Sequence, residues 1–523
     1  MPRRPNRVLA LAGLTTDLAV PTALAAPAGT SRGPSTPTDP YVLPVADGVS
    51  TKSLLTVSDA GSASDGYEMV GIPDGLGALR QSGSRDLTLF MNHELRADTG
   101  VVRRHGQNGA FVAELDIDSD SFEIESGRDL IDPGVRFWDY PSQAYRTGVP
   151  SGGGPNPRDP SDTFIAGLTD FARFCSGFLS EPGQLLNRET SRGFRGQIYF
   201  ANEENGDEGR VFGVTPDGQA QQLPRLGLFS WENTLVAPTG SDTTLALGNE
   251  DTADGQLWAY VGRKQSSGNP FTRAGLTNGR NFVVDLADEN TDTDAEFRAN
   301  YGKGQPAGFT LGPEEEVNWD RSGKRQNEEA KVKGLTLNRI EDGSFDPRNP
   351  GDYYFLTTEG SPGTVPSEPT VTRDGGGLWR LHFRDVNRPE RGGTLELLLD
   401  GTEAPFLNKP DNMTIDRRGN LLIQEDPGNN AQLARIVAYE IETGNRGVVA
   451  EFDGTRFRTG GAQFITQDEE SSGIIEARRF LGKGWFLFDA QVHAPNPEAE
   501  KVEFGQLLAL HVRRFRDVYD IED

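Results

Sequence analysis

The chain contains one cysteine, Cys175, among its 523 residues, so no disulfide can form within it. A lone thiol is left with three roles, which are packing, nucleophilic attack and metal binding. Histidine is scarce as well, with five residues, and no two of them lie at zinc-binding spacing. The motif H-E-x-x-H is also missing, so the sequence argues against a histidine-rich zinc site. A pairing of His93 with Cys175 as base and nucleophile stays open.

Basic residues are few relative to acidic ones. Lys and Arg number 52 against 78 Asp and Glu, which gives a net charge of −26. Such a surface is a poor partner for nucleic acid and for an anionic membrane. Beyond the first thirty residues no run is long and apolar enough to span a bilayer, so we expect no stable membrane insertion. The G-x-S-x-G elbow, the P-loop and the dinucleotide fingerprint are missing too.

The N-terminus has the features of an export signal. The basic start at Arg3-Arg4 precedes a modest apolar stretch, and Ala23-Leu24-Ala25 fits an A-x-A cleavage site. We therefore expect a signal peptide over residues 1–25 and a secreted or periplasmic protein, with the twin-arginine route indicated by the paired arginines. Residues 26–50, rich in Pro, Thr, Ser and Gly, predict a flexible leader before a single domain over residues 51–523.

The rest of the chain repeats one pattern of acid, apolar run, acid and second apolar run. With 63 Gly and 33 Pro breaking many short apolar runs, the composition favours β structure. The copies open and close at Pro73-Asp74-Gly75 and Asn92-His93-Glu94, Cys175 and Glu203-Glu204, Trp231-Glu232-Asn233-Thr234 and Asn249-Glu250-Asp251, Arg339-Ile340-Glu341 and Glu359, Pro410-Asp411-Asn412 and Glu425-Asp426, and Glu469-Glu470-Ser471-Ser472-Gly473 and Asp489. Six such copies predict an all-β, six-bladed propeller, with loop insertions at 136–165 and 265–310.

Ordinary turn chemistry could place Asp and Asn at strand ends. The acids, however, recur at the same place in each copy and include Glu, which is a weaker turn former. Acids at equivalent ends of the innermost strands would meet at one mouth of the central channel, where only cations could offset their repulsion. The pattern therefore predicts a central metal site. Its oxygen ligands suit calcium, and a thiolate among them suits iron.

These motifs together resemble those of the PhoX-type secreted alkaline phosphatases. The resemblance covers this chain from about residue 45 to 495. The shared residues are Asn92-His93-Glu94, Asp170 with Cys175, Glu203-Glu204, Trp231-Glu232-Asn233-Thr234, Arg339 with Glu341, Pro410-Asp411-Asn412, Glu425-Asp426 and Glu470-Ser471-Ser472-Gly473. The resemblance implies a six-bladed propeller with a central cluster of calcium (Ca2+) and iron (Fe3+) ions.

The resemblance also implies roles for individual residues. Cys175 matches the iron-ligand cysteine, and Arg339 with Glu341 matches the arginine and glutamate that serve the phosphate and the metals. The other metal ligands implied are Asp170, Glu204, Glu250, Glu341, Glu425, Asp426 and Glu470. Ile340 departs from the proline expected between Arg339 and Glu341.

The function implied is a metal-dependent phosphatase that hydrolyses small-molecule phosphate monoesters and acts as a monomer. Arg339 would hold the phosphate through a planar fork that lysine cannot reproduce. A salt bridge from Arg339 to Glu341 or another acid is the structural alternative. Two other functions stay open: a calcium-dependent propeller hydrolase such as a phosphodiesterase or lactonase, and a binding propeller that calcium merely stabilises. Cys175 argues against the first, because such a hydrolase needs no thiol beside the metal, and metal content separates the phosphatase from both: calcium with iron favours it, and calcium alone favours the others.

Overall fold

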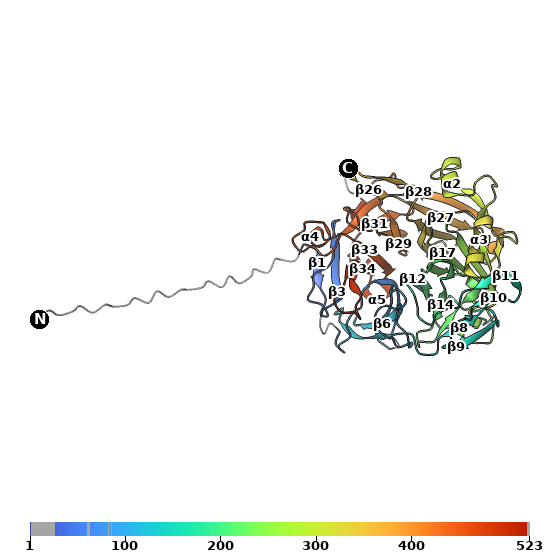
Figure 1. Cartoon of the computed structure of the whole chain (residues 1–523). Coiled ribbons are helices and arrows are strands. Elements are labelled where there is room, and N and C mark those ends of the chain that lie inside the picture. The colour runs from blue at the N-terminus through green and yellow to red at the C-terminus, as the bar shows by residue number, and fades with distance from the viewer. Residues whose placement is uncertain (2–26, 60–62, 82, 85, 520–523) are drawn as a thin grey trace.

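The structure, a computed structural model, describes Met1 and residues 27–59, 63–81, 83–84 and 86–519. Its main sheets stand around a central channel as a six-bladed β-propeller (Figure 1), which confirms the predicted fold class. Figure 1 shows β12 (Phe174–Leu179), β29 (Pro410–Ile415) and β33 (Glu469–Glu476) near the middle of the ring. The predicted signal peptide lies outside the described residues, apart from Met1.

Each blade is an antiparallel sheet of four main strands that run outward from the channel. Blade 1 holds β4 (Pro73–Arg80), β5 (Leu87–His93), β6 (Phe111–Ile117) and β7 (Ile124–Asp129). Blade 2 holds β12, β13 (Tyr199–Glu203), β14 (Val211–Val214) and β15 (Ala220–Gln222). Blade 3 holds β16 (Trp231–Val236), β17 (Thr243–Glu250), β18 (Leu257–Arg263) and β19 (Arg280–Val283).

The second half of the ring repeats this arrangement. Blade 4 holds β23 (Ile340–Phe345), β24 (Asp352–Thr357), β27 (Gly377–Phe383) and β28 (Gly393–Leu399). Blade 5 holds β29, β30 (Asn420–Glu425), β31 (Arg435–Glu440) and β32 (Arg446–Phe452). Blade 6 holds β33, β34 (Trp485–Pro495), β35 (Glu503–Val512) and, as its outer strand, β3 (Val49–Thr56).

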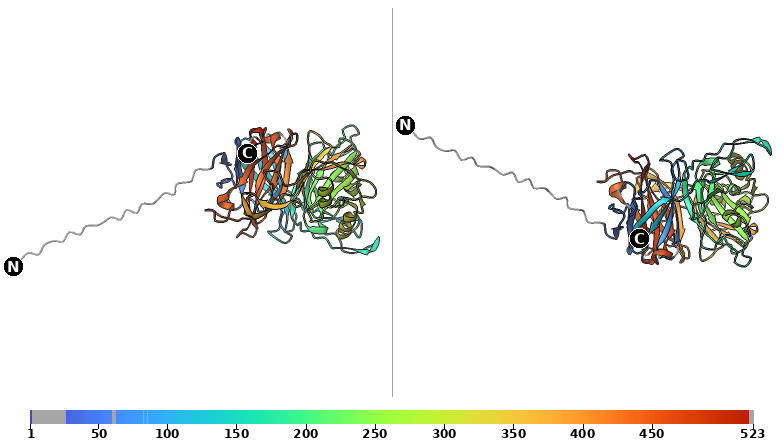
Figure 2. Two further views of the ribbon diagram at one scale, coloured as in Figure 1. Left: turned by 90° about the horizontal axis from the view of Figure 1, so that it is seen from above. Right: turned by 90° about the horizontal axis from the view of Figure 1, so that it is seen from below.

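Blade 6 closes the ring because it takes strands from both ends of the chain. The N-terminal β3 pairs antiparallel with the C-terminal β35, and Figure 2 shows the blue and red segments side by side from above and below. The innermost strands contact one another in chain order, and β33 contacts β4. Blades 2 and 5 therefore face each other across the channel, with two blades between them on either side.

The structure corrects the expected boundary between leader and propeller. Within the stretch predicted as a flexible leader, β1 (Thr30–Arg32) pairs with β3, and β2 (Val42–Pro44) pairs with β32 of blade 5. Val42 is fully buried. The composition did not reveal these pairings, because the open edges of two sheets supply the backbone partners.

The insertions contain more regular structure than the predicted loops. Blade 2 is extended by β8 (Arg136–Asp139) and β9 (Ala144–Thr147), blade 3 by β22 (Glu316–Val317), and blade 4 by β20 (Asp285–Leu286) and β21 (Ala307–Thr310). Two hairpins stand apart, β10 (Gly154–Asn156) with β11 (Asp159–Phe164) and β25 (Pro362–Val365) with β26 (Glu368–Asp374).

Helices are short and lie between or outside the blades. The α-helices are α1 (Pro270–Arg273), α2 (Asp294–Asn300), α3 (Gly323–Lys333), α4 (Gly454–Phe457), α5 (Arg478–Leu481) and α6 (Arg516–Tyr519), and the 3-10 turns are η1 (Gly206–Glu208), η2 (Pro224–Leu226) and η3 (Pro389–Arg391). In the longest, α3, Ser322 caps the N-terminus by accepting a hydrogen bond from the Arg325 N–H. No helix in the described part of the chain is long and apolar enough to cross a membrane.

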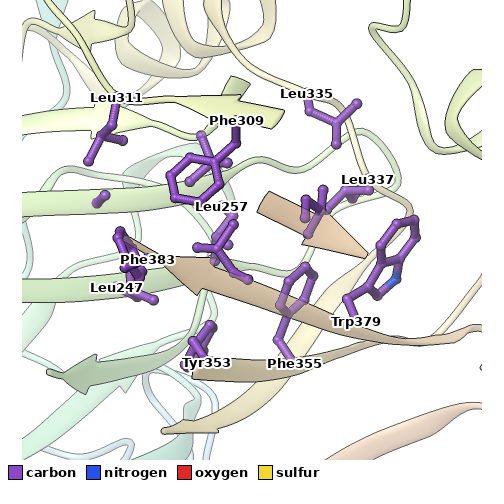
Figure 3. Packing of buried hydrophobic residues seen from close by; sticks show 14 of the residues in the cluster. Leu247, Leu257, Phe309, Leu311, Leu335, Leu337, Tyr353, Phe355, Trp379 and Phe383 are labelled. Atoms are coloured by element: carbon purple, nitrogen blue, oxygen red, sulfur yellow. The ribbon is translucent and has the colours of Figure 1, made fainter. Parts of the chain in front are cut away.

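The hydrophobic core lies between neighbouring blades rather than in one central mass. Inner strands are buried on both faces, so β24 is buried along its whole length, whereas the outer strand β28 alternates buried and half-buried residues. Figure 3 shows Leu247 and Leu257 of blade 3 packed toward Tyr353, Phe355 and Trp379 of blade 4. This packing fixes neighbouring blades relative to one another around the channel.

Candidate metal centre

The innermost strands of blades 2 to 5 start with a bulge that leaves two residues without partners on the next strand. The irregularities lie between Phe174 and Gly177, Trp231 and Thr234, Ile340 and Gly343, and Pro410 and Met413. A bulge bends its strand and re-aims side chains. The first residues of these bulges are Cys175, Glu232, Glu341 and Asp411, and Asp74 lies beside a shorter irregularity in blade 1. Five blades thus each contribute, at an equivalent position, one side chain that could bind a metal ion.

A repeated backbone hydrogen bond holds a second set of side chains beside the first. In every blade, the residue after or near the end of the second strand donates its N–H to a carbonyl just ahead of the innermost strand. The pairs are Glu94 to Ile72, Glu204 to Arg173, Asp251 to Ser230, Thr358 to Arg339, Asp426 to Lys409 and His493 to Asp468, with N···O distances of 2.9–3.0 Å. Ile72, Arg173, Arg339 and Lys409 have φ between 47° and 58°, a left-handed conformation that is uncommon for residues other than glycine.

Together these positions form three overlapping groups of ligating atoms. In each group the atoms lie within 4.8 Å of one another, and the groups are Asp74, Glu94 and Cys175; Cys175, Glu204 and Glu232; and Glu232, Glu341 and Asp411. Cys175 and Glu232 each belong to two groups. The seven residues therefore make one continuous array that follows the channel wall from blade 1 to blade 5.

The array is buried and strongly repulsive without cations. Burial, followed by the neighbouring acids, raises the pKa of Asp74 and Asp411 well above the usual range, and the pKa of the Cys175 thiol rises for the same reasons. Burial raises the pKa of Glu232 to about 8. Buried carboxylates that share a site need protons or metal ions to offset their charge. Carboxylate oxygens with one thiolate fit hard cations together with a softer one, so the donor set fits calcium and iron.

Two arginines lie at equivalent places beside this array. Arg339 donates from Nε and Nη2 to the two oxygens of Asp251, both at 2.8 Å, and its Nη2 lies 3.2 Å from Glu341. Arg173 donates from Nε to Glu94 at 2.7 Å and from Nη2 to Glu204 at 2.5 Å. Both side chains are about one-third exposed, so each contacts the acids on one side and solvent on another.

A polar layer lies directly behind the acidic array. The Asn412 amide donates to the Ser176 hydroxyl at 2.7 Å, and because these residues come from opposite blades, this bond crosses the channel. Asn233 donates to Asp342 at 2.7 Å in the same layer. Beyond it, the far halves of the innermost strands line a mostly apolar cavity of about 590 Å³.

A comparison with family models assigns this chain. Residues 183–476, more than half of the chain, match the family described as alkaline phosphatase PhoX. The chain belongs to the alkaline phosphatase PhoX family. The matched region contains Glu204, Glu232, Glu341 and Asp411 of the array, and it begins after Cys175.

Comparison with one solved structure shows the fold. The structure of Pseudomonas fluorescens PhoX in complex with vanadate, a transition state analogue, matches with a TM-score of 0.59 and 13% identity, over 90% of this chain and 97% of that chain. Pseudomonas aeruginosa periplasmic gluconolactonase, PpgL, matches with a TM-score of 0.33 and 12% identity, over 83% and 85% of the two chains. No curated protein sequence matches.

Within this PhoX-family chain, the structure brings part of the predicted site together. Cys175, Glu204 and Glu341 lie in the acidic array, and Arg339 contacts Glu341. Their assignment as metal ligands and phosphate-binding residue stays a prediction.

Two other predicted ligands have carboxylates engaged by neighbouring strands. Glu250 accepts from the Trp258 indole N–H at 2.8 Å and the Gln256 N–H at 3.0 Å. Glu425 accepts from both Nε and Nη2 of Arg435, at 2.9 and 2.6 Å. Neither belongs to any of the three groups found among the described residues. The same holds for Asp170, which is partly exposed and whose backbone carbonyl accepts from Arg210.

The last two predicted ligands, Asp426 and Glu470, lie at the edge of the array. Burial, followed by the charge of Asp426, raises the pKa of Glu470 to about 7. The Gln491 amide lies 3.3 Å from Glu470 and 3.4 Å from Asp74, and so bridges blades 6 and 1. These contacts complete the ring of acids around the mouth.

The predicted site omits Asp74, Glu94, Glu232 and Asp411, which all lie in the array, and Arg173 beside it. The signal for the four acids was present, since each lies in one of the repeated motifs. Two adjacent acids, such as Glu203 and Glu204, end the second strand of a blade. The first accepts hydrogen bonds from the next strand region of its own blade, as Glu203 does from Arg210, and the second faces the channel, as Glu204 does. The repeat locates such a pair, but only the strand register shows which member faces the channel.

Proposed function

We propose that this protein is a secreted, metal-dependent phosphatase that hydrolyses phosphate monoesters at the mouth of its propeller channel. One observation carries the proposal: single ligating side chains from five blades converge on that mouth, in a chain that belongs to the alkaline phosphatase PhoX family. Acids that served only to end strands would not need to gather at one mouth from five blades, nor to include a thiol.

The array divides naturally between two kinds of metal. Cys175 with Asp74, Glu94 and Glu204 would hold iron, because a thiolate prefers a softer ion. Glu232, Glu341 and Asp411 offer oxygen alone and would hold calcium. The bound ions would supply Lewis-acid polarisation of the phosphate and neutralise charge on it.

Arg339 is placed to orient the substrate. Its Nε and Nη2 are held by Asp251, and no hydrogen bond of its Nη1 is found among the described residues. Nη1 would therefore donate to a phosphate oxygen, while the two-point pairing with Asp251 prevents the guanidinium from turning. The sequence predicts that Arg339 holds the phosphate with two parallel N–H donors. Asp251 already occupies one such edge of the guanidinium, so we propose a single donor, Nη1, to the phosphate.

Arg173 would act on the other side of the mouth. Its contacts with Glu94 and Glu204 hold these two carboxylates together at one guanidinium, beside Cys175. Its positive charge also offsets part of the negative charge that an anionic substrate meets on approach. We propose further that the protein is exported by the twin-arginine route, carries calcium and iron, and acts as a monomer on small-molecule esters.

The test is hydrolysis of p-nitrophenyl phosphate by purified protein at pH 8–9, before and after treatment with EGTA and an iron chelator. We expect hydrolysis that the chelators abolish and that added calcium and iron restore. Bis(p-nitrophenyl) phosphate and a sugar lactone serve as comparison substrates. Faster hydrolysis of the diester or the lactone would replace the proposal with the corresponding activity, and calcium binding without any hydrolysis would leave a binding propeller.

A matched pair of variants separates the site from general stability. Glu341→Gln removes a carboxylate of the array, whereas Glu396→Gln removes one that pairs with Arg380 at the outside of the same blade. We expect activity loss in the first variant and near-normal activity in the second. Equal effects would argue against the proposed site.

A further inference from the structure

The polar layer behind the acidic array contains a directed chain of hydrogen bonds. The Gly473 N–H donates to the Asn412 Oδ1 at 2.8 Å, the Asn412 Nδ2 donates to the Ser176 Oγ at 2.7 Å, and the Ser176 hydroxyl donates to Glu232 at 2.5 Å. We name these four residues the cross-channel chain. It links blades 6, 5, 2 and 3.

The direction of every hydrogen bond in the cross-channel chain follows from the first donor, the Gly473 N–H. A backbone N–H can only donate, so Gly473 fixes the oxygen of the Asn412 amide toward itself and the NH₂ group toward Ser176. The Ser176 oxygen receives that N–H, and its own proton is then free to point at the Glu232 carboxylate. Asn412, Ser176 and Glu232 are all at least 98% buried, so water cannot easily replace these partners.

Glu232 is the carboxylate whose position matters most to the array. It belongs both to the group that contains Cys175 and to the group that contains Glu341 and Asp411. Rotation of its carboxylate would separate these two groups. A hydrogen bond from Ser176 stabilises the ionised form of Glu232 and restricts its rotation.

The cross-channel chain also gives a role to Asn412 and Gly473 of the sequence motifs, and to Ser176 beside Cys175. Ser176 follows Cys175, Asn412 follows Asp411, and Gly473 lies three residues after Glu470. Gly473 has φ +54°, and a side chain there would lie 2.9 Å from the Asp74 carbonyl and 3.0 Å from Asp489. Glycine is therefore required for the backbone to present its N–H to Asn412.

We propose that Ser176 and Asn412 are positioning residues, which act through Glu232 to set the metal affinity of the centre. The inference rests on the proposed function, since it concerns the same site. Partners that orient metal ligands typically change metal affinity or activity by about 10- to 100-fold when removed.

The test compares two buried serines at the same strand. Ser176→Ala removes the donor to Glu232, and Ser180→Ala, just beyond the end of β12, removes a hydroxyl that accepts from the Ile198 N–H far from the array. Calcium affinity is measured by titration of chelator-treated protein, together with iron content, thermal stability, kcat and KM. We expect Ser176→Ala to lower calcium affinity by about 10- to 100-fold and Ser180→Ala to leave it within about twofold.

A second variant checks the direction of the chain. Asn412→Asp keeps the size of the side chain but cannot donate to Ser176, so it should weaken calcium binding as Ser176→Ala does. Because both residues act through one chain, the double variant should be little weaker than either single one. The control is Asn281→Asp in β19 of blade 3, which changes a buried amide that donates to the Leu226 carbonyl of η2.

The outcomes separate this inference from the proposed function. Calcium affinity within twofold of wild type in both Ser176→Ala and Asn412→Asp overturns the inference, even if the enzyme is a phosphatase. If wild type binds calcium but hydrolyses no phosphate ester, the proposed function fails. The calcium affinity of the variants relative to wild type still decides the inference. If the losses of calcium affinity add in the double variant, Ser176 and Asn412 do not act through one chain of hydrogen bonds. Absence of metal binding by wild type overturns both.

Discussion

Removal of the metals should make the stability of this protein fall as pH rises. The relevant group is Glu232, which is fully buried and whose pKa rises from 4.5 to about 8 when no metal is present. Between these two values the folded state holds a proton that the unfolded state has released. The folded state then binds more protons, so the free energy of unfolding decreases with increasing pH across this window.

The magnitude follows from the width of the window. From pH 5.0 to 7.5 the loss is about 1.36 kcal/mol for each pH unit, or roughly 3 kcal/mol from Glu232 alone. An unfolding entropy of about 2.1 cal/mol/K per residue gives about 1 kcal/mol/K for a chain of this length, so Tm should fall by about 3 °C. Burial raises the pKa of Asp74, Glu341 and Asp411 as well, and these groups act in the same direction.

The assay is thermal unfolding of metal-loaded and chelator-treated protein at several pH values from 5.0 to 7.5. Bound cations should hold these acids ionised, so the loaded protein should show a much smaller slope. Glu232→Gln has no carboxyl to titrate, and its metal-free form should lose about 3 °C less over the same range. A flat or rising Tm in metal-free wild type, or an unchanged slope in Glu232→Gln, would refute the reasoning.

Three further substitutions test individual residues. Arg339→Lys loses the planar pairing with Asp251 and the Nη1 donor, so kcat should fall by roughly 100- to 1000-fold with metal content unchanged, and activity within twofold of wild type would assign Arg339 a structural role. Cys175→Ser replaces the thiolate with a hard, weakly acidic hydroxyl, so elemental analysis and the visible absorption spectrum should show loss of iron with most calcium retained; unchanged iron content would contradict this. Glu425→Gln leaves Arg435 buried without its charged partner and should lower stability by about 3 kcal/mol or more in a denaturant titration, with full metal content in the folded protein. Loss of metal without loss of stability would instead make Glu425 a ligand, as the sequence predicted.

The repeated pattern in the sequence determined the architecture because it reflects local chemistry. Apolar runs such as that over Tyr353–Leu356 need burial on both faces, and Gly, Asn and Asp end strands wherever they occur. Six copies of such a unit can bury their faces only against one another, which gives a closed ring. Residues 26–50 could not be recognised as structured because local patterns do not show pairing with distant strands. Residues such as Val42 have no partner nearby in sequence, and the partner strand β32 lies some 400 residues later.

The sequence also determined that acids and a thiol would meet at one mouth, and it located Cys175, Glu204 and Glu341. It could not decide between adjacent acids, because successive residues of a strand point to opposite sides and a bulge shifts that alternation. The register places Glu250 against Trp258 and turns Glu232 inward. The contact between Ser176 and Asn412, 236 residues apart, depends on two blades that face each other across the channel. Only closure of the ring brings these side chains together, so only the tertiary structure could show them.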